Sequence, residues 1–152
     1  TTASTGAYSV SLFWMGIFAG RLGVSVLYRG TRQEYLVLGL SLLAAASLGL
    51  VLLVSSTAAV AVGVFLTGLG LSALYPLVMN LVGRYFRSGV AVGTAATGGG
   101  IGSFTFPFLM AVVSESIGLR GGFWFYFGLT LILVVLSLVI VAVTRRAPAA
   151  RA

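Results

Sequence analysis

The sequence lacks four residue types that carry much of enzyme chemistry, because it has no cysteine, histidine, aspartate or lysine. Their absence excludes Ser-His and Cys-His nucleophile pairs, Schiff-base lysines, His/Cys zinc sites and C-x-x-C redox motifs. The two carboxylates, Glu34 and Glu115, are 81 positions apart and fall in different predicted loops. We therefore expect no enzyme activity, no catalytic residue, no metal site and no bound cofactor.

Charged residues are also scarce. They make up 7% of the 152 residues, whereas soluble domains carry about 25%. Hydrophobic residues make up 59%, and the mean hydropathy is +1.14. This composition excludes a soluble domain and excludes disorder, which requires a polar chain. The net charge of +7 comes from arginines scattered between apolar runs, so we expect a lipid bilayer and not nucleic acid as the partner.

Long apolar runs dominate the chain. A membrane-spanning helix needs about 20 mostly apolar residues, and five stretches meet that requirement. They cover about residues 6–27, 35–54, 58–83, 90–113 and 122–144, and a basic tail follows at 145–152. Membrane β-strands would instead alternate polar and apolar residues over short segments. The sequence predicts an all-α integral membrane protein with five transmembrane helices.

The arginines predict how these helices are oriented. With five spans, the loop at 28–34, the loop at 84–89 and the tail lie on one side of the membrane. They hold Arg29, Arg32, Arg84, Arg87, Arg145, Arg146 and Arg151. The other side holds Arg120 alone. Because arginine collects on the cytoplasmic side, we predict a multi-pass protein of the cytoplasmic (inner) membrane, with its N-terminus outside and its C-terminus cytoplasmic.

The N-terminal segment is not a signal peptide, since TTASTGAYSV has no basic region. The chain also begins at Thr1 and not at methionine. We interpret it as a piece of a longer protein.

The spans differ in polarity. The second and fifth are almost wholly apolar, so we predict that both face lipid at the periphery. The fifth opens with the aromatic run 123–127, which is typical of a belt at headgroup depth.

The third span contains the chain's only asparagine, Asn80, together with Tyr75 and Pro76. Pro76 cannot donate a backbone hydrogen bond and predicts a kink. A polar side chain inside a span usually faces protein or a water-filled cavity. Asn80 and Tyr75 therefore either line a cavity or form interhelical hydrogen bonds.

The fourth span contains a glycine triplet, Gly98, Gly99 and Gly100, followed by Gly102 and Pro107. Gly98 and Gly102 form a small-x-x-x-small pair, which permits close approach of two helices. The glycines predict tight packing, a segment that bends during gating, or both.

The first span contains Arg21 near its inner end. An arginine at that depth must pair with an acid, contact carbonyl groups or extend to the interface. Glu34 or a residue outside this chain is a candidate partner.

Several motifs occur in an order that resembles a known family. They are G-R-L-G at 20–23, Y-R-G-T-R at 28–32, L-Y-P at 74–76, T-G-G-G-I-G at 97–102 and F-P-F at 106–108. This order resembles the C-terminal half of major facilitator superfamily transporters, and most closely the fucose permease branch. The resemblance implies that the spans are helices eight to twelve of a twelve-helix protein. The acidic member of the family's cytoplasmic loop motif is missing.

The resemblance implies a secondary active transporter that moves a small polar solute, such as a sugar, by alternating access with a proton gradient. The solute contacts would be Tyr75, Asn80 and Trp14. The gating and helix-packing residues would be Arg21, Arg29, Arg32, Pro76, Gly98, Gly99, Gly100 and Gly102. The partner would be the missing N-terminal half of the same transporter. Two alternatives stay open, namely a drug or metabolite exporter of the same fold and a non-transporting membrane subunit that binds a partner.

Overall fold

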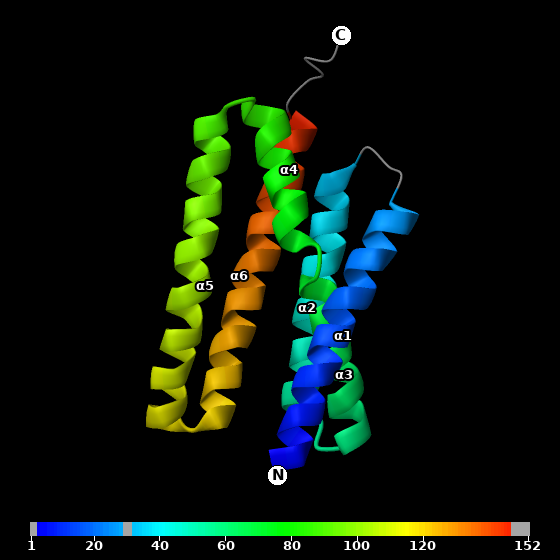
Figure 1. Cartoon of the computed structure of the whole chain (residues 1–152), viewed down its shortest axis with the longest axis vertical. Coiled ribbons are helices and arrows are strands. Elements are labelled where there is room, and N and C mark those ends of the chain that lie inside the picture. The colour runs from blue at the N-terminus through cyan, green and yellow to red at the C-terminus, as the bar shows by residue number, and fades with distance from the viewer. Residues whose placement is uncertain (1–2, 29–31, 147–152) are drawn as a thin grey trace.

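The computed structural model describes residues 3–28 and 32–146. These residues form six α-helices joined by short connections (Figure 1). In chain order the helices are α1 (Ala3–Leu27), α2 (Gln33–Leu53), α3 (Thr57–Leu71), α4 (Leu74–Phe86), α5 (Gly89–Ile117) and α6 (Leu119–Arg146).

Five helical segments are long and apolar enough to cross a membrane. Four are single helices, and the fifth is the pair α3 and α4, which together cover Thr57–Phe86. This architecture confirms the predicted fold class, an all-helical membrane protein with five spans. Within the described residues there is no β-strand.

Two predicted loops are shorter than expected. Gly118 alone separates α5 from α6, so Glu115 and Arg120 lie on helices and not in a loop. Gly118 has a φ of 82°, which glycine adopts at no steric cost, and this permits the tight turn. Glu34 likewise lies in the first turn of α2.

The five spans alternate in direction, so the described ends of the helices lie at two ends of the bundle (Figure 1). The end of α1, the connection after α4 and the end of α6 lie at one end, whereas the start of α1 and the connections after α2 and α5 lie at the other. Among the described residues, the first end therefore holds Arg32, Arg84, Arg87 and Arg145, whereas the second holds Arg120.

Glycines bring α1 and α3 into close contact. A Cβ atom at Gly16 would collide with the backbone of Phe65, and one at Gly68 would collide with the backbone of Phe13. Gly16 and Gly20 form a G-x-x-x-G pair on α1, and such pairs let helix backbones approach closely in membranes. The small-residue pair predicted from the sequence lies instead on the fourth span, at Gly98 and Gly102.

The second span is central in the bundle, contrary to the predicted peripheral position. Helix α2 packs against α3, α4 and α6, and its buried residues include Ser41, Ala44 and Ser47. The Ser47 hydroxyl also forms a 3.0 Å hydrogen bond with that of Thr67 on α3. Lipid and a helix neighbour are equally apolar, so apolar character does not separate them. The small residues Ser41, Ala44, Ala45 and Ser47 were the informative signal.

Helix α5 lies at the edge of the bundle, where it contacts α4 and α6. All of α5 belongs to the described part of the chain, and none of its residues is buried. The helix continues through Gly98–Gly100 and past Pro107 without a break.

Candidate functional site

The third span is broken between α3 and α4, at Ser72 and Ala73. The Ser72 N–H bonds to the Leu69 carbonyl at 3.3 Å, which is a tighter i to i−3 turn, and Ala73 has a non-helical ψ of 2°. Regular helix resumes when the Leu77 N–H donates to the Ala73 carbonyl at 3.0 Å. In a continuous helix the residue at position 76 would donate to the Ser72 carbonyl. Pro76 has no N–H, so the helix breaks one turn before the proline.

Arg21 contacts the break from α1. Its Nε atom donates a 3.1 Å hydrogen bond to the Ser72 carbonyl oxygen. The neighbouring Gly20 lies against Ser72 and the Leu69 carbonyl, where a Cβ atom would have no room. Three contacts were considered for Arg21 from the sequence, namely an acid, a carbonyl group and the membrane interface. In the structure Arg21 contacts a carbonyl group. Among the described residues, Arg21 forms no ion pair with Glu34, which was one of its two candidate partners.

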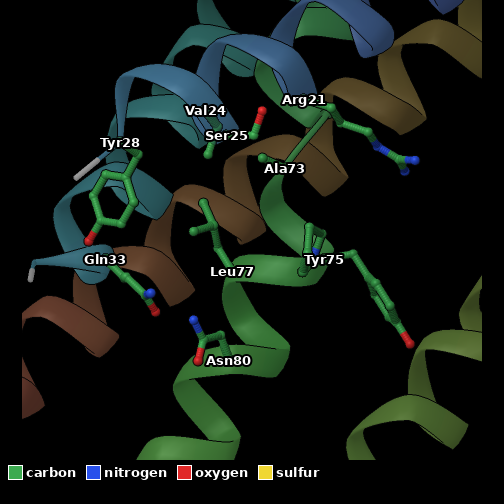
Figure 2. A pocket seen from close by; sticks show the side chains of 10 residues that line it. Arg21, Val24, Ser25, Tyr28, Gln33, Ala73, Tyr75, Leu77 and Asn80 are labelled. Carbon is green, nitrogen blue, oxygen red and sulfur yellow. The ribbon is translucent and has the colours of Figure 1, made fainter. Parts of the chain in front are cut away.

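A pocket of about 590 Å³ opens beside this break (Figure 2). Its walls come from the last turns of α1, the first residue of α2, and the first half of α4. The lining residues are Arg21, Val24, Ser25, Tyr28, Gln33, Ala73, Tyr75, Pro76, Leu77 and Asn80. The structure therefore brings together Arg21, Tyr75, Pro76 and Asn80, four of the residues singled out in the sequence.

Three polar side chains of the pocket, those of Ser25, Tyr28 and Gln33, were not singled out as candidate site residues in the sequence. The hydroxyl of Tyr28 and the Oε1 atom of Gln33 are buried and have no hydrogen-bond partner in the described part of the chain. Figure 2 shows the side chains of Gln33 and Asn80 directed toward the same part of the pocket. Gln33 is the only glutamine in the sequence, as Asn80 is the only asparagine. Rarity alone could have drawn attention to Gln33.

The phenol of Tyr28 is more weakly acidic than usual. Burial raises its pKa, the negative charge of Glu34 raises it further, and Arg84 opposes both effects. Tyr28 is therefore a neutral hydrogen-bonding group at physiological pH.

Tyr75 reaches from α4 to α5. A Cβ atom at Gly99 would lie 2.9 Å from the Cε2 atom of the Tyr75 ring, so the absent side chain leaves room for the ring. The other glycines of the run do not pack against another helix. Gly98 and Gly100 have no neighbour within 4 Å of a Cβ position, and Gly102 meets only Phe106 of its own helix.

Trp14 does not line the pocket. It is 62% exposed on α1, and its ring packs edge-on against Phe13 with centroids 6.2 Å apart. Trp14 precedes Arg21 by seven residues, so the two share a helix face about 10.5 Å apart along the axis.

Arg32 contacts an aromatic ring, and within the described residues it forms no ion pair with an acid. Its guanidinium lies 5.8 Å from the centroid of Tyr35, and that of Arg145 lies 5.3 Å from the same centroid. Arg145 also donates from Nε to the Tyr35 hydroxyl at 2.6 Å. This cluster joins the start of α2 to the end of α6. The other predicted gating arginine, Arg29, lies outside the described residues.

Five apolar helical segments of span length within the described residues define a multi-pass membrane protein, and three of the spans line the pocket. The family model of the Major Facilitator Superfamily matches residues 1–152, so the chain belongs to this superfamily of membrane transporters. This match confirms the resemblance at the level of the superfamily. Comparisons with curated proteins and with solved structures found no match.

Proposed function

We propose that this chain forms one wall of a secondary active transporter that carries a small polar solute, with sugars as the leading class. The supporting observation is the pocket that joins Arg21, Tyr75 and Asn80 to Tyr28 and Gln33, whose buried polar atoms have no partner among residues 3–28 and 32–146. Amides, hydroxyls and a guanidinium together offer both donors and acceptors, as a polyhydroxylated solute requires. An aromatic ring such as Tyr75 supplies an apolar surface for a sugar face.

The chain would supply half of a pseudosymmetric carrier. Tyr75 is 55% exposed and Asn80 is exposed, although both line the pocket. A second helix bundle of the same protein would cover them. Alternating access then follows when the two bundles rock around a site near the midplane. In this proposal the five spans are helices eight to twelve, and Trp14 extends the solute path along α1.

The arginine-rich end would face the cytoplasm. Arg32, Arg84, Arg87 and Arg145 share one end of the bundle, with Arg120 at the other. In this proposal the protein lies in the cytoplasmic membrane, and the positive-inside rule supports a C-terminus on the cytoplasmic side. The pocket extends from the break in the middle of the third span toward that end, where Tyr28 and Gln33 line it.

Uptake by the full-length protein in liposomes tests the proposed function. Radiolabelled neutral monosaccharides should enter saturably, and an imposed pH gradient should drive their accumulation if protons are coupled. Equal uptake with and without the gradient would contradict proton coupling. No uptake of sugars together with efflux of apolar cations would favour the exporter alternative.

A substitution in the pocket links this uptake to the site. Asn80→Ala removes an amide donor and acceptor, and loss of two hydrogen bonds of about 1 kcal/mol each predicts a KM raised roughly tenfold to thirtyfold. The matched control is Ser116→Ala, because that hydroxyl is exposed near the end of α5, does not line the pocket and donates to the Val113 carbonyl of its own helix. An unchanged KM for Asn80→Ala would contradict this assignment of the site.

A further inference from the structure

Pro76 leaves one backbone acceptor without its helical donor. In an α-helix each carbonyl accepts from the N–H four residues later, so the proline deprives the Ser72 carbonyl. Ser72 is only 3% exposed. Its own hydroxyl is already committed to the Leu69 carbonyl at 2.7 Å. A buried carbonyl without a donor is costly, and more so inside a membrane.

Arg21 provides the missing donor from another helix. The 3.1 Å bond from its Nε atom reaches the very carbonyl that Pro76 leaves unpaired. The close approach depends on Gly20, since any side chain there would meet Ser72. A guanidinium suits this role, because its rigid fork stays charged and donates from several N–H groups.

The bond lies at the point where the direction of α4 is set. Helix α4 begins at Leu74, two residues after Ser72, and buries Leu74, Leu77 and Leu81 on one face. That packing turns Tyr75 toward Gly99 on α5 and Asn80 toward the pocket (Figure 2). The orientation of the pocket wall therefore follows from the geometry at Ser72.

We propose that Arg21 is a positioning residue that replaces the N–H missing at Pro76 and so fixes α4, and with it Tyr75, relative to α1. Arg21 acts through the Ser72 carbonyl within this chain, and Pro76 creates the need for it. The effect on solute handling rests on the proposed function, whereas the effect on the position of Tyr75 does not.

A double-mutant cycle on the full-length protein in lipid nanodiscs tests this coupling. Because this chain has no cysteine, Tyr75→Cys gives a thiol reporter once any cysteine elsewhere in the protein is replaced. The reaction rate of this thiol with a charged maleimide is measured in four backgrounds, namely the parent, Arg21→Met, Pro76→Ala and both. Arg21→Met keeps an apolar stem and removes every donor.

We expect Arg21→Met to change the labelling rate of the thiol reporter by about tenfold in the Pro76 background. A change of about tenfold is what the loss of a hydrogen bond from a charged donor predicts. In the Pro76→Ala background the same change should alter the rate less than about twofold, because the N–H restored at position 76 can donate to Ser72. Arg21→Lys should retain part of the parent behaviour.

Arg120→Met is the matched control. Arg120 also donates to a helix-end carbonyl, that of Leu52 at 3.2 Å, but no proline creates that acceptor. Its removal should leave the labelling of the thiol reporter within about twofold of the parent in both backgrounds.

Two results would overturn the proposal. One is an unchanged labelling rate in a folded Arg21→Met protein. The other is an equal change in both backgrounds, which would mean that Arg21 acts on a group other than Ser72. If Arg21→Met fails to fold, recovery of a monodisperse protein by Pro76→Ala supports the proposal, and no recovery contradicts it. Sugar uptake measured in parallel separates the two proposals, since labelling requires no solute.

Discussion

Two segments of this protein share a local pattern and fold differently. Ser72-Ala-Leu-Tyr-Pro76 and Ser103-Phe-Thr-Phe-Pro107 both place a serine four residues before a proline and an aromatic residue directly before it. Both serine hydroxyls bond to the carbonyl three residues earlier, at 2.7 Å in each case. The first segment nevertheless breaks its span into α3 and α4, whereas the second lies within the unbroken α5.

The surroundings of the two segments account for the difference. Ser72 is buried and its carbonyl accepts from Arg21, whereas Ser103 is exposed on a helix that buries no residue. A proline always frees a carbonyl, but a neighbouring helix decides whether that carbonyl is held in a new geometry. A break in a membrane helix is thus a property of two helices and not of one.

Disturbing the close contact beside the break should have the largest effect. Gly20→Leu would place a side chain against Ser72 and the Leu69 carbonyl. Even its Cβ atom would lie only 2.8 Å from that oxygen. We expect a loss of about 1–3 kcal/mol in the free energy of unfolding, measured by denaturation in mixed micelles. Gly98→Leu is the control, because Gly98 has open space around it. Equal losses for the two variants would contradict this packing.

Replacing each proline should have the next largest effect. Pro107→Ala restores an N–H that can donate to the Ser103 carbonyl within α5, so we expect a gain of about 1 kcal/mol in unfolding free energy. Pro76→Ala should gain less, since Arg21 already bonds to the Ser72 carbonyl. The same micelle denaturation checks both. A larger gain in unfolding free energy for Pro76→Ala than for Pro107→Ala would contradict the claim that Arg21 already satisfies the Ser72 carbonyl.

Glycine-to-alanine changes on α5 should have a smaller effect. Gly100→Ala should stabilise by up to about 1 kcal/mol, as expected for alanine in a helix. Gly99→Ala should gain roughly 0.5 kcal/mol less, because its Cβ would displace the Tyr75 ring from a 2.9 Å contact. Solvent quenching of tyrosine fluorescence would report the displacement. Identical behaviour of the two variants would show that Tyr75 does not rest on Gly99.

The pocket beside the break also predicts a pH effect, which should be the smallest. The pKa of Tyr28 is raised in the folded protein, chiefly by burial. The folded state therefore binds this proton more tightly than the unfolded state, so stability is constant below about pH 10 and falls as the pH rises through the folded pKa. Tyr28→Phe should flatten that decline in alkaline unfolding experiments. An unchanged decline would assign the effect to other groups.

The fold class could be predicted because the bilayer imposes a length and a composition on each span. The positions of the helices could not be predicted in the same way. Apolar character did not distinguish the central α2 from a lipid-facing helix, and glycine pairs looked alike at Gly16/Gly20 and Gly98/Gly102. Packing against a specific neighbour separates such cases, and a single sequence does not show neighbours.

Some residues of the candidate site could be predicted from the sequence, and others could not. Tyr75, Pro76 and Asn80 stood out because polar groups and prolines are unusual within a span, and Arg21 stood out for the same reason. Tyr28 and Gln33 did not, since both lie at the ends of helices, where polar residues are ordinary. The contact between Arg21 and Ser72 joins residues 51 positions apart, and no local pattern predicts which carbonyl an arginine will reach.

The carbonyl of Ser72 tests the central claim most directly. Ser-Ala and Ser-Phe each occur once in this sequence, at 72–73 and 103–104, so ¹³C-carbonyl serine with ¹⁵N-alanine or ¹⁵N-phenylalanine isolates each carbonyl by NMR in nanodiscs. We predict that Arg21→Met shifts the Ser72 carbonyl upfield, as loss of a hydrogen bond does, and leaves Ser103 unchanged. A Ser72 carbonyl that does not move would contradict the claim that Arg21 replaces the donor missing at Pro76.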